Sequence, residues 1–381
     1  MICTEKLPVP PAAGGAVQLY IDGVVPYLSK RHDITVYSVA YPGLEEEEIR
    51  AGVRYIRVPG QNSEEYLGNM KDRLASRKSS GEYDIIYVFN RPLWVLALGN
   101  IVPDARFILS LHNEMFHHEK ISDSEGMQCI ERLDLINTVS KFIADGVVRR
   151  FPEAQNKVKV IYSGADVNLY RPNWSEAGIL NRKRLKEMCK LEGFKVVLFV
   201  GRLSSKKGVH ILIKAMKRVM ESHRDTALVI VGSKWYGGNK SDEYTRYLQN
   251  LSKELKGPVI FTGFLKPDAI PPYYNLGDIF VCPSQWDEPL ARVHYEAMAA
   301  GLPIITTNKG GNAEVIAGYK NGLVIKDSGN PEVMADYIAH LLNNPSRALE
   351  MGKRGRELAE RKYNWERVAK DILNEIDSLR L

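Results

Sequence analysis

The sequence lacks most of the features that mark specialised classes of protein. It has only four cysteines in 381 residues, and their spacing matches neither a disulfide framework nor a zinc site. No apolar run approaches the roughly 18 residues of a membrane span, and the N-terminus lacks the basic start and long apolar centre of a signal peptide. We therefore expect a cytoplasmic protein with reduced thiols, and we leave peripheral contact with a membrane open.

Three functional signatures are missing as well. No basic run resembles a nucleic-acid-binding arm, and the net charge of +6 is mild and spread along the chain. The longest like-charge run is acidic, Glu45 to Glu48, and we expect it to start or flank a solvated loop. No complete G-x-G-x-x-G occurs, which argues against a dinucleotide cofactor. No Asp-x-Asp pair occurs either, the pair with which many sugar transferases hold a divalent cation. We expect no nucleic-acid partner, no cofactor and no metal.

Short apolar runs alternate with helical patterns from end to end, which is the sequence signal for parallel sheets covered by helices. The predicted fold class is α/β, with two doubly wound, Rossmann-like domains that face each other across a cleft. We predict one domain over 1–167, a linker with a short helix over 168–193, and a second domain over 194–364. The helix within 365–381 carries an apolar stripe that we expect to pack back on the first domain. The apolar start, residues 1–3, is short for a buried strand, so we expect further strand residues upstream.

The most informative segment, residues 283–303, carries two glutamates eight positions apart. We predict Glu288 in a strand-to-helix loop and Glu296 about one turn into the following helix. Backbone N–H groups before a helix suit a diphosphate, and a carboxylate nearby can accept hydrogen bonds from sugar hydroxyls. Two solvated glutamates on a surface helix would be the ordinary interpretation of an isolated pair. The small residues of Ala-Met-Ala-Ala-Gly-Leu-Pro favour a site, because they let the helix pack tightly beside it.

Two cations follow the apolar strand predicted over Lys195–Val200. Charge-assisted hydrogen bonds from Arg202 and Lys207 would neutralise a leaving nucleoside diphosphate as its charge develops. Without a divalent metal, these two side chains would take over the electrostatic role of the ion. An ordinary basic turn remains the alternative for this segment alone.

Further candidates lie in the first half of the chain. Gly14 and Gly15 precede the first predicted helix, where glycines let backbone amides approach a phosphate or sugar closely. His112 ends an apolar strand, a position suited to ligand contact in an α/β sheet. A simple tight turn and a structural histidine stay open as alternatives. The adjacent pair His117-His118 has a spacing that suits no common metal site.

Taken together, these residues resemble glycosyltransferase family 4, the retaining enzymes of GT-B architecture, over essentially the whole chain. The glutamate pair is the most specific element, and the run Gly310-Gly311-Asn312-Ala313-Glu314 matches the family too. The segments that begin at Thr4, His112 and Ala291 look most like spore-coat-associated glycosyltransferases of endospore-forming bacteria. The resemblance implies transfer of a sugar from a UDP-sugar to an acceptor hydroxyl with retention, in cell-surface, polysaccharide or spore-coat glycan synthesis. The uridine base rests on family habit alone.

The resemblance also implies roles for single residues. Glu296 would bind ribose hydroxyls, Glu288 would contact the donor sugar, and His112 would sit near the transferred sugar. The catalytic set is then His112, Glu288, Arg202 and Lys207. The donor-binding set is Gly14, Gly15, Arg202, Lys207, Phe264, Leu265, Leu290, Ala291, Arg292 and Glu296. A glycan, a lipid-linked sugar and a protein all stay open as acceptors, and association with the spore coat stays open as well.

The chain departs from the family at one place. Family members usually have glycine and an aliphatic residue where Ala291 and Arg292 stand. Ala291 leaves the backbone contact with the phosphate open. Arg292 adds a cation near the expected phosphate or sugar site, where it would favour an acidic donor sugar or add a phosphate contact.

Two other functions remain open on this architecture. A UDP-sugar epimerase would consume the donor without an acceptor, but the glutamate pair argues against it. A non-catalytic spore-coat protein that kept the fold would not require all four charges at Arg202, Lys207, Glu288 and Glu296. Binding of the donor without turnover would support this second alternative.

Overall fold

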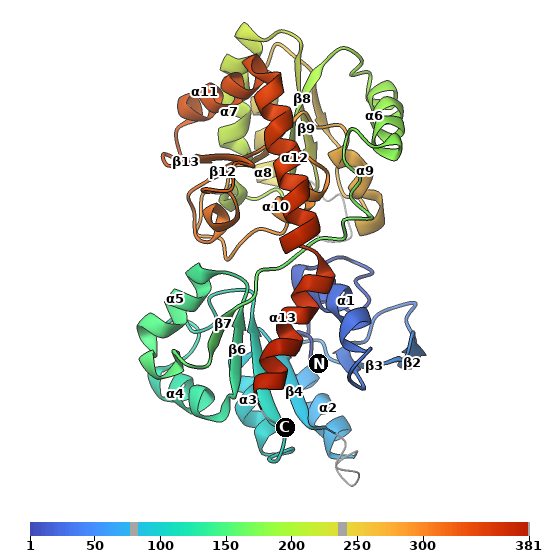
Figure 1. Cartoon of the computed structure of the whole chain (residues 1–381), viewed down its shortest axis with the longest axis vertical. Coiled ribbons are helices and arrows are strands. Elements are labelled where there is room, and N and C mark those ends of the chain that lie inside the picture. The colour runs from blue at the N-terminus through green and yellow to red at the C-terminus, as the bar shows by residue number, and fades with distance from the viewer. Residues whose placement is uncertain (77–82, 235–241, 380–381) are drawn as a thin grey trace. The chain divides into compact units, whose positions relative to one another are not determined.

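The computed structural model describes residues 1–76, 83–234 and 242–379. The chain divides into two compact units, one formed by Met1–Ser163 with Trp365–Leu381 and the other by Gly164–Asn364 (Figure 1). Each unit is built on a mainly parallel sheet with connecting helices, the α/β architecture that the alternating sequence pattern predicted.

Among its described residues, the first unit contains seven strands. Its sheet segments run β2-β3-β1 and β4-β5-β6-β7. The bounds of its elements are α1 (Ala16–Leu28), β1 (Thr35–Val39), β2 (Glu47–Arg50), β3 (Val53–Val58), α2 (Ser63–Ala75), β4 (Ile85–Phe89), α3 (Pro92–Gly99), β5 (Arg106–Leu111), α4 (Asp123–Arg132), β6 (Leu135–Thr138), α5 (Lys141–Arg150), β7 (Val158–Val160) and α13 (Trp365–Ser378).

The first residues of the chain occupy the central position between these two segments. The N–H group of Ile2 donates to the carbonyl of Tyr87 at 2.7 Å, and Phe89 donates back to Ile2 at 3.1 Å. On the other side, the N–H group of Cys3 donates to Tyr37 at 2.9 Å. Residues 1–3 therefore pair with β1 and with β4 and join the two segments into one sheet.

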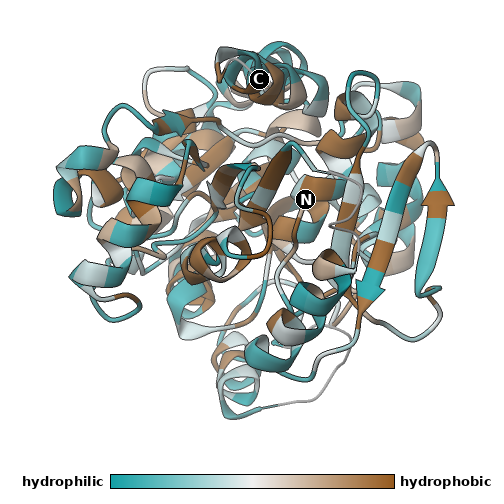
Figure 2. Ribbon diagram, turned by 90° about the horizontal axis from the view of Figure 1, so that it is seen from below, coloured by the Kyte–Doolittle hydropathy of each residue, from teal (hydrophilic) through white to brown (hydrophobic). Residues whose placement is uncertain are grey.

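Strand β2 begins within the acidic run, which we expected to start or flank a solvated loop. Glu47 and Glu48 are part of this strand, which pairs antiparallel with β3. An edge strand with one exposed face has no apolar run to reveal it, and Figure 2 shows β2 as largely hydrophilic. Its acidic side chains face arginines instead: Glu47 lies 3.3 Å from Arg54, and Glu48 forms an ion pair with Arg57, whose side chain is fully buried.

Helices cover both faces of this sheet. One apolar cluster joins α1 and α13 to the strands through residues such as Tyr20 and Trp365, whose rings meet edge to face at 5.9 Å. A second cluster gathers α2, α3, α4 and α5 on the opposite side. In Figure 2, hydrophobic strands accordingly lie between helices with hydrophilic outer sides. Helix α13, the last of the chain, is thus part of the first unit.

The second unit holds a six-stranded parallel sheet in the order β10-β9-β8-β11-β12-β13. Its apolar core joins the strands to α7, α8, α11 and α12. The bounds of its elements are α6 (Glu176–Cys189), β8 (Lys195–Val200), α7 (Val209–Ser222), β9 (Thr226–Val231), α8 (Glu243–Ser252), β10 (Val259–Phe261), α9 (Pro271–Tyr274), β11 (Ile279–Cys282), α10 (Val293–Ala299), β12 (Ile304–Thr307), β13 (Gly322–Ile325), α11 (Pro331–Asn343) and α12 (Pro345–Lys362).

The segment predicted as a linker is an integral part of this second unit. Its helix α6 packs against α9. Arg182 of α6 donates to the carbonyl groups of Asn275, Leu276 and Gly277 at 3.0 Å each, and it pairs with Asp278 at 2.6 Å. The charged, irregular composition that indicated a linker therefore belongs to a surface helix that Arg182, among other contacts, ties to the second unit.

Candidate functional site

The order of the strands places a site at one edge of the second sheet. Strands β8, β9 and β10 succeed one another to one side of the sheet, and β11, β12 and β13 to the other. The strand order therefore reverses between the neighbours β8 and β11, and ligands of open α/β sheets bind beyond the carboxyl ends of strands at such a point. The loop after β8 carries Arg202 and Lys207, and the loop after β11 carries Glu288. A bond of 2.8 Å from the N–H of Gln285 to the carbonyl of Lys206 joins the two loops.

Glu288 is the buried centre of these loops. Glu288 is only 3% exposed. Its Oε1 accepts hydrogen bonds from Lys207 Nζ at 2.5 Å and from Ser284 Oγ at 2.6 Å. Burial by itself raises the pKa of this carboxyl, but the charge of Lys207 and the two hydrogen bonds outweigh burial, so the pKa lies below its ordinary value. Two residues predicted separately, Glu288 and Lys207, thus form an ion pair, and the site contains an ionised carboxylate beside a cation.

Glu296 lies in the first turns of α10 and is held by a tyrosine. Its Oε2 accepts a hydrogen bond of 2.7 Å from the hydroxyl of Tyr274, a residue that is fully buried. Burial and the neighbouring charge of Glu296 raise the pKa of Tyr274 well above its ordinary value, so this hydroxyl remains a donor across the working pH range. The ring of Tyr170 meets that of Tyr274 edge to face at 5.3 Å, which fixes the tyrosine further.

Arg292 faces the same carboxylate. Its guanidinium lies 3.6 Å from Oε1 of Glu296, and it donates to the carbonyl of Gly164 at 3.4 Å. The positive charge of Arg292, which we expected to act on the donor, therefore acts partly on Glu296 within the protein.

The backbone of Ala291 is held on both sides. Its N–H group donates to Asn312 Oδ1 at 3.0 Å, so the amide that the sequence left open for a phosphate already has a partner. Its carbonyl lies 2.8 Å from Nδ1 of His294, a residue with no exposed surface. Because a carbonyl only accepts, Nδ1 carries the proton, and Nε2 accepts from the hydroxyl of Thr306 at 2.8 Å. Leu290, the residue before Ala291, is buried.

His294 gives the folded protein an acid-sensitive element. Burial, the largest cause, lowers its pKa from 6.5 to about 4. An unfolded chain binds this proton near pH 6.5 and the folded chain only near pH 4, so we expect the free energy of unfolding to fall as the pH drops through this window. The expected loss is about 1.4 kcal/mol per pH unit. Urea unfolding at several pH values between 7 and 4 should show a shallower decline in His294→Gln than in wild type.

The exposed residue His118 provides the control for this measurement. His118→Gln should leave the pH dependence of unfolding unchanged, because His118 has no part in the contacts of His294 with Ala291 and Thr306. Equal slopes for wild type and His294→Gln would contradict the assignment of this element to His294.

Three other predicted residues of this unit lie in neighbouring loops. Arg202 is exposed in the loop after β8, while Phe264 and Leu265 are half-buried after β10. Gly263, just before them, forms an antiparallel bridge with Gly232, the residue that follows β9. All three predicted residues therefore lie beyond the carboxyl ends of strands in this sheet.

The remaining predicted residues belong to the first unit. Gly15 is the N-cap of α1, and Gly14 precedes it. The N–H of His112 donates to Asn90 Oδ1 at 2.7 Å, and its ring packs edge to face on Tyr20 at 4.7 Å. Asn90 follows β4 as His112 follows β5, so both lie at the carboxyl edge of the first sheet. The polar residue directly after an apolar strand was the signal that could have pointed to Asn90.

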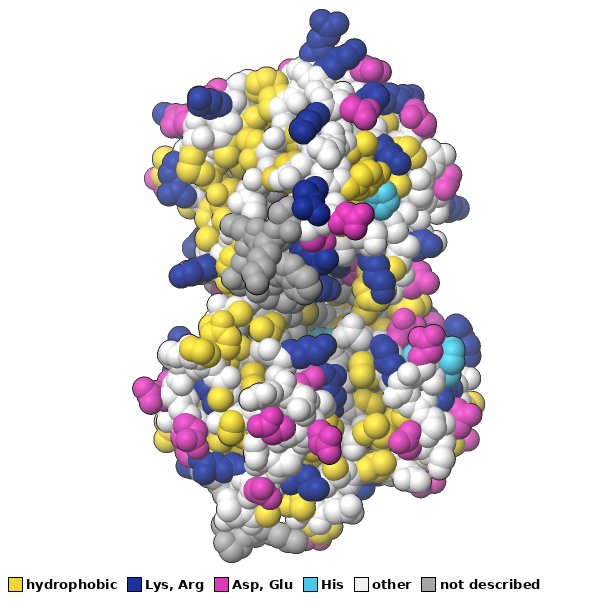
Figure 3. Space-filling view, turned by 180° about the vertical axis from the view of Figure 1, so that it is seen from behind, with side chains coloured by type: hydrophobic (Ala, Val, Ile, Leu, Met, Phe, Trp, Pro, Cys, Tyr) yellow, Lys and Arg dark blue, Asp and Glu magenta, His cyan; other side chains and the backbone are white. Residues whose placement is uncertain are grey.

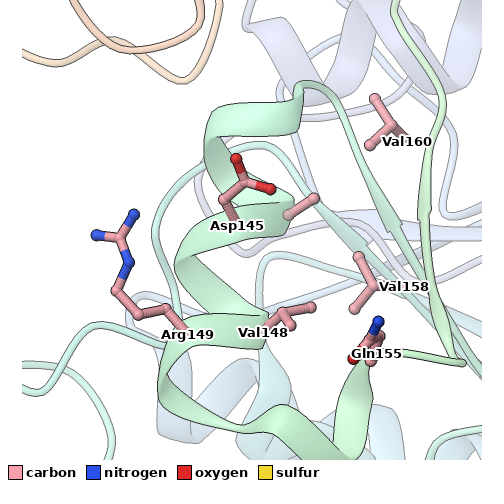
Figure 4. A pocket seen from close by; sticks show the side chains of 7 residues that line it. Asp145, Val148, Arg149, Gln155, Val158 and Val160 are labelled. Atoms are coloured by element: carbon pink, nitrogen blue, oxygen red, sulfur yellow. The ribbon is translucent and has the colours of Figure 1, made fainter.

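Two surface features include none of these residues. A hollow of about 450 Å³ lies between α5 and β7, lined by Val148, Val158 and Val160 among others (Figure 4). On the turn after β5, the donor atoms of His117, His118 and Glu119 lie within 4.8 Å of one another. From the sequence we considered only the two histidines and did not consider Glu119 as a third donor. Neither feature includes a predicted site residue.

On the face drawn in Figure 3, acidic and basic side chains are interspersed over both units, without an extended patch of one sign. Among the described residues, no helix combines the length and the apolar character needed to cross a bilayer.

Comparison with known families identifies both halves of the chain. Residues 13–169 match the model of glycosyltransferase family 4, and residues 182–358 match that of glycosyl transferases group 1. The chain is 46% identical to spore coat protein SA of Bacillus subtilis, over 98% of this chain and 97% of that protein. It is 42% identical to the YtcC protein of the same organism, over 97% and 89%. A GDP-mannose-dependent phosphatidylinositol monomannoside mannosyltransferase of Mycolicibacterium smegmatis is 28% identical over 93% of each chain.

Solved structures share the whole fold. Sucrose-phosphate synthase of Thermosynechococcus elongatus superposes with a TM-score of 0.80 at 21% identity, over 99% of this chain and 98% of that one. Anabaena HepE, solved in complex with UDP and glucose, gives 0.77 at 22% identity over 99% of each chain. At these identities the likeness establishes the fold alone, which is GT-B.

Proposed function

The chain belongs to glycosyltransferase family 4 and is a glycosyltransferase; from this premise we propose that it transfers a sugar from a UDP-sugar to an acceptor hydroxyl, with retention and without a divalent metal. The observation that carries the proposal is the buried carboxylate of Glu288, kept ionised by Lys207 at the point where the strand order reverses. A cation beside a sugar-binding carboxylate is what a nucleoside diphosphate sugar requires, since its charge and its hydroxyls lie close together.

Each group of the second unit then has a task. Lys207 and Arg202 neutralise the diphosphate, Glu288 accepts hydrogen bonds from sugar hydroxyls, and Glu296 accepts them from the ribose. The bond between the anomeric carbon and the phosphate oxygen breaks while the acceptor oxygen attacks from the same face. Because the acceptor attacks the anomeric carbon directly, no protein nucleophile is needed. The acceptor proton passes to the departing phosphate oxygen, so no protein base is needed either. His112 keeps, as part of the proposal, a role toward the transferred sugar.

The similar proteins differ in the base of the nucleotide. HepE was solved with UDP, whereas the mycobacterial relative carries GDP-mannose in its name. The donor test therefore compares both bases. Thermal shift and calorimetry with UDP, GDP, ADP and several UDP-sugars should show selective stabilisation by UDP that a chelator leaves unchanged. Glu296→Ala should weaken that stabilisation.

The surface cluster at His117 is a reason to control the chelator experiment. His118→Ala removes one donor atom of the cluster and should respond to UDP as wild type does. If GDP alone stabilised the protein, the base of the proposed donor would be guanine instead of uracil. Stabilisation that disappears with the chelator in both proteins would overturn the metal-free mechanism.

A second candidate function has one specific observation in its favour. The relative that is 46% identical carries the name of a spore coat protein. A coat component that binds a nucleotide sugar without turnover would show the same thermal shift but would release no UDP with any acceptor. Release of UDP from the donor in the presence of a glycan, lipid-linked or protein acceptor decides against it.

A further inference from the structure

The turn after β12 packs directly on the loop that carries Glu288. Gly310 has a φ of +56°, and a Cβ atom built on it would lie 2.0 Å from the carbonyl oxygen of Glu288 and 2.6 Å from its nitrogen. Side chains rarely adopt this backbone conformation and never tolerate such a contact with backbone atoms. The two loops can therefore touch only because residue 310 is a glycine.

Three consecutive residues of this turn bind three points of the Glu288 loop. The N–H of Gly310 donates to Asp287 Oδ1 at 3.1 Å, and the N–H of Gly311 donates to the carbonyl of Glu288 at 2.8 Å. Asn312 Oδ1 accepts from the N–H of Ala291 at 3.0 Å. The turn thereby fixes the start, the middle and the end of the segment Asp287–Ala291.

An asparagine at position 312 lowers the stability of the folded protein, because part of its side chain is buried without a hydrogen-bond partner in the described part of the chain. It has no exposed surface, and its Nδ2 has no hydrogen-bond partner among the described residues. A buried donor without a partner costs free energy, so packing alone would favour an apolar side chain of the same size. An apolar side chain would leave the buried N–H of Ala291 without its partner. The hydrogen bond to Ala291 therefore explains why an amide stands at position 312.

We propose that residues 310–312 act as a clamp on the donor-binding loop, with Asn312 as its positioning residue. The proposal rests on the function proposed above, because it concerns the diphosphate end of the same site. By occupying the amide of Ala291, Asn312 withdraws that donor from the diphosphate and sets the place of Glu288. The side chains of Lys207 and Arg202 then have to neutralise the charge of the diphosphate. The clamp thus accounts for a chain that has alanine where its family usually has glycine.

A second buried asparagine provides a matched control. Asn321 also has no exposed surface, makes one side-chain hydrogen bond to a backbone group, to Val315 at 3.2 Å, and leaves its other polar atom without a partner among the described residues. It contacts no part of the Glu288 loop through these bonds. Asn312→Leu and Asn321→Leu should therefore lose similar stability but differ at the donor site.

The experiment measures amide hydrogen exchange over residues 286–292 and the Kd for UDP by calorimetry, in the full chain. In Asn312→Leu, exchange of this segment should rise by about tenfold, and the Kd should rise by about five- to tenfold, as the loss of one ordering hydrogen bond allows. Asn321→Leu should change neither. Unchanged exchange in Asn312→Leu would overturn the clamp, even if UDP binds. Faster exchange in a protein that binds no nucleotide would leave the clamp standing and overturn the proposed function instead.

Discussion

Replacing Lys207 by methionine should lower the rate of sugar transfer by about 10²- to 10³-fold, the usual effect of removing one preorganised electrostatic group. The lysine is placed for this effect because its ammonium lies 2.5 Å from Glu288 Oε1 and keeps only 20% of its side chain exposed. A cation in such surroundings is weakly screened, so it acts strongly on charge that develops at a departing diphosphate. Initial rates of UDP release under saturating donor provide the measurement.

The same substitution should also destabilise the protein, by about 3 kcal/mol, because it leaves a buried carboxylate without its cation. The pKa of Glu288 should then rise, since burial is no longer opposed by Lys207. A raised pKa means that the variant regains stability as the pH falls, so its deficit relative to wild type should narrow on acidification. Urea unfolding at two pH values tests this sign.

Two further variants separate the electrostatic effect on transfer from the loss of stability. Lys207→Met combined with Glu288→Gln removes both charges and should recover much of the melting temperature without recovering transfer. The neighbouring Lys206, an exposed residue over the ring of Trp286, is the matched control. Lys206→Met should lower the rate by less than tenfold, because an exposed cation acts through screened charge. An equal loss in both lysine variants would show that general positive charge, rather than this ion pair, supports transfer.

The residues that sequence could predict are those whose chemistry is visible in one short segment. Glu288 and Lys207 are charged groups in the loops that follow apolar strands, and Glu296 lies in the helix after the second of these loops. The structure joins Glu288 and Lys207 in the ion pair just described. The residues that hold them were missed. Ser284 and Tyr274 are ordinary residue types in sequence, and only the three-dimensional fold brings each within hydrogen-bond distance of its glutamate.

The fold shows the same division between local and distant information. Apolar runs such as Lys195–Val200 are recognisable alone, because both faces of a central parallel strand are buried. Strand β2 is recognisable only through its partners, since its acidic side chains are matched by arginines of β3 and α2. The role of Asn312 likewise depends on a contact between residues that are far apart in the sequence. A Gly-Gly-Asn turn says nothing of Ala291 until the strands place both loops at one edge of the sheet.

Glu296→Gln should weaken the binding of UDP by about 10- to 100-fold, because hydrogen bonds from ribose hydroxyls to a charged acceptor are worth about 1.5–3 kcal/mol. Calorimetric titration measures the Kd. The neutral amide keeps the shape of the side chain, so the variant should retain its fold. It should also change the contact with Arg292, whose guanidinium lies 3.6 Å from Oε1. Binding at the wild-type Kd would remove the ribose role from Glu296.

Tyr274→Phe tests how much of this affinity comes from orientation. The ring keeps its contacts with Tyr170 and Phe280, but Oε2 of Glu296 loses the hydroxyl that holds it. We expect the Kd for UDP to rise about fivefold, the value of one hydrogen bond of about 1 kcal/mol. Tyr273→Phe, one residue earlier and half-buried, is the control and should bind as wild type does. If Tyr274→Phe alters only the melting temperature, the tyrosine supports the core and Glu296 is oriented by the charge of Arg292 instead.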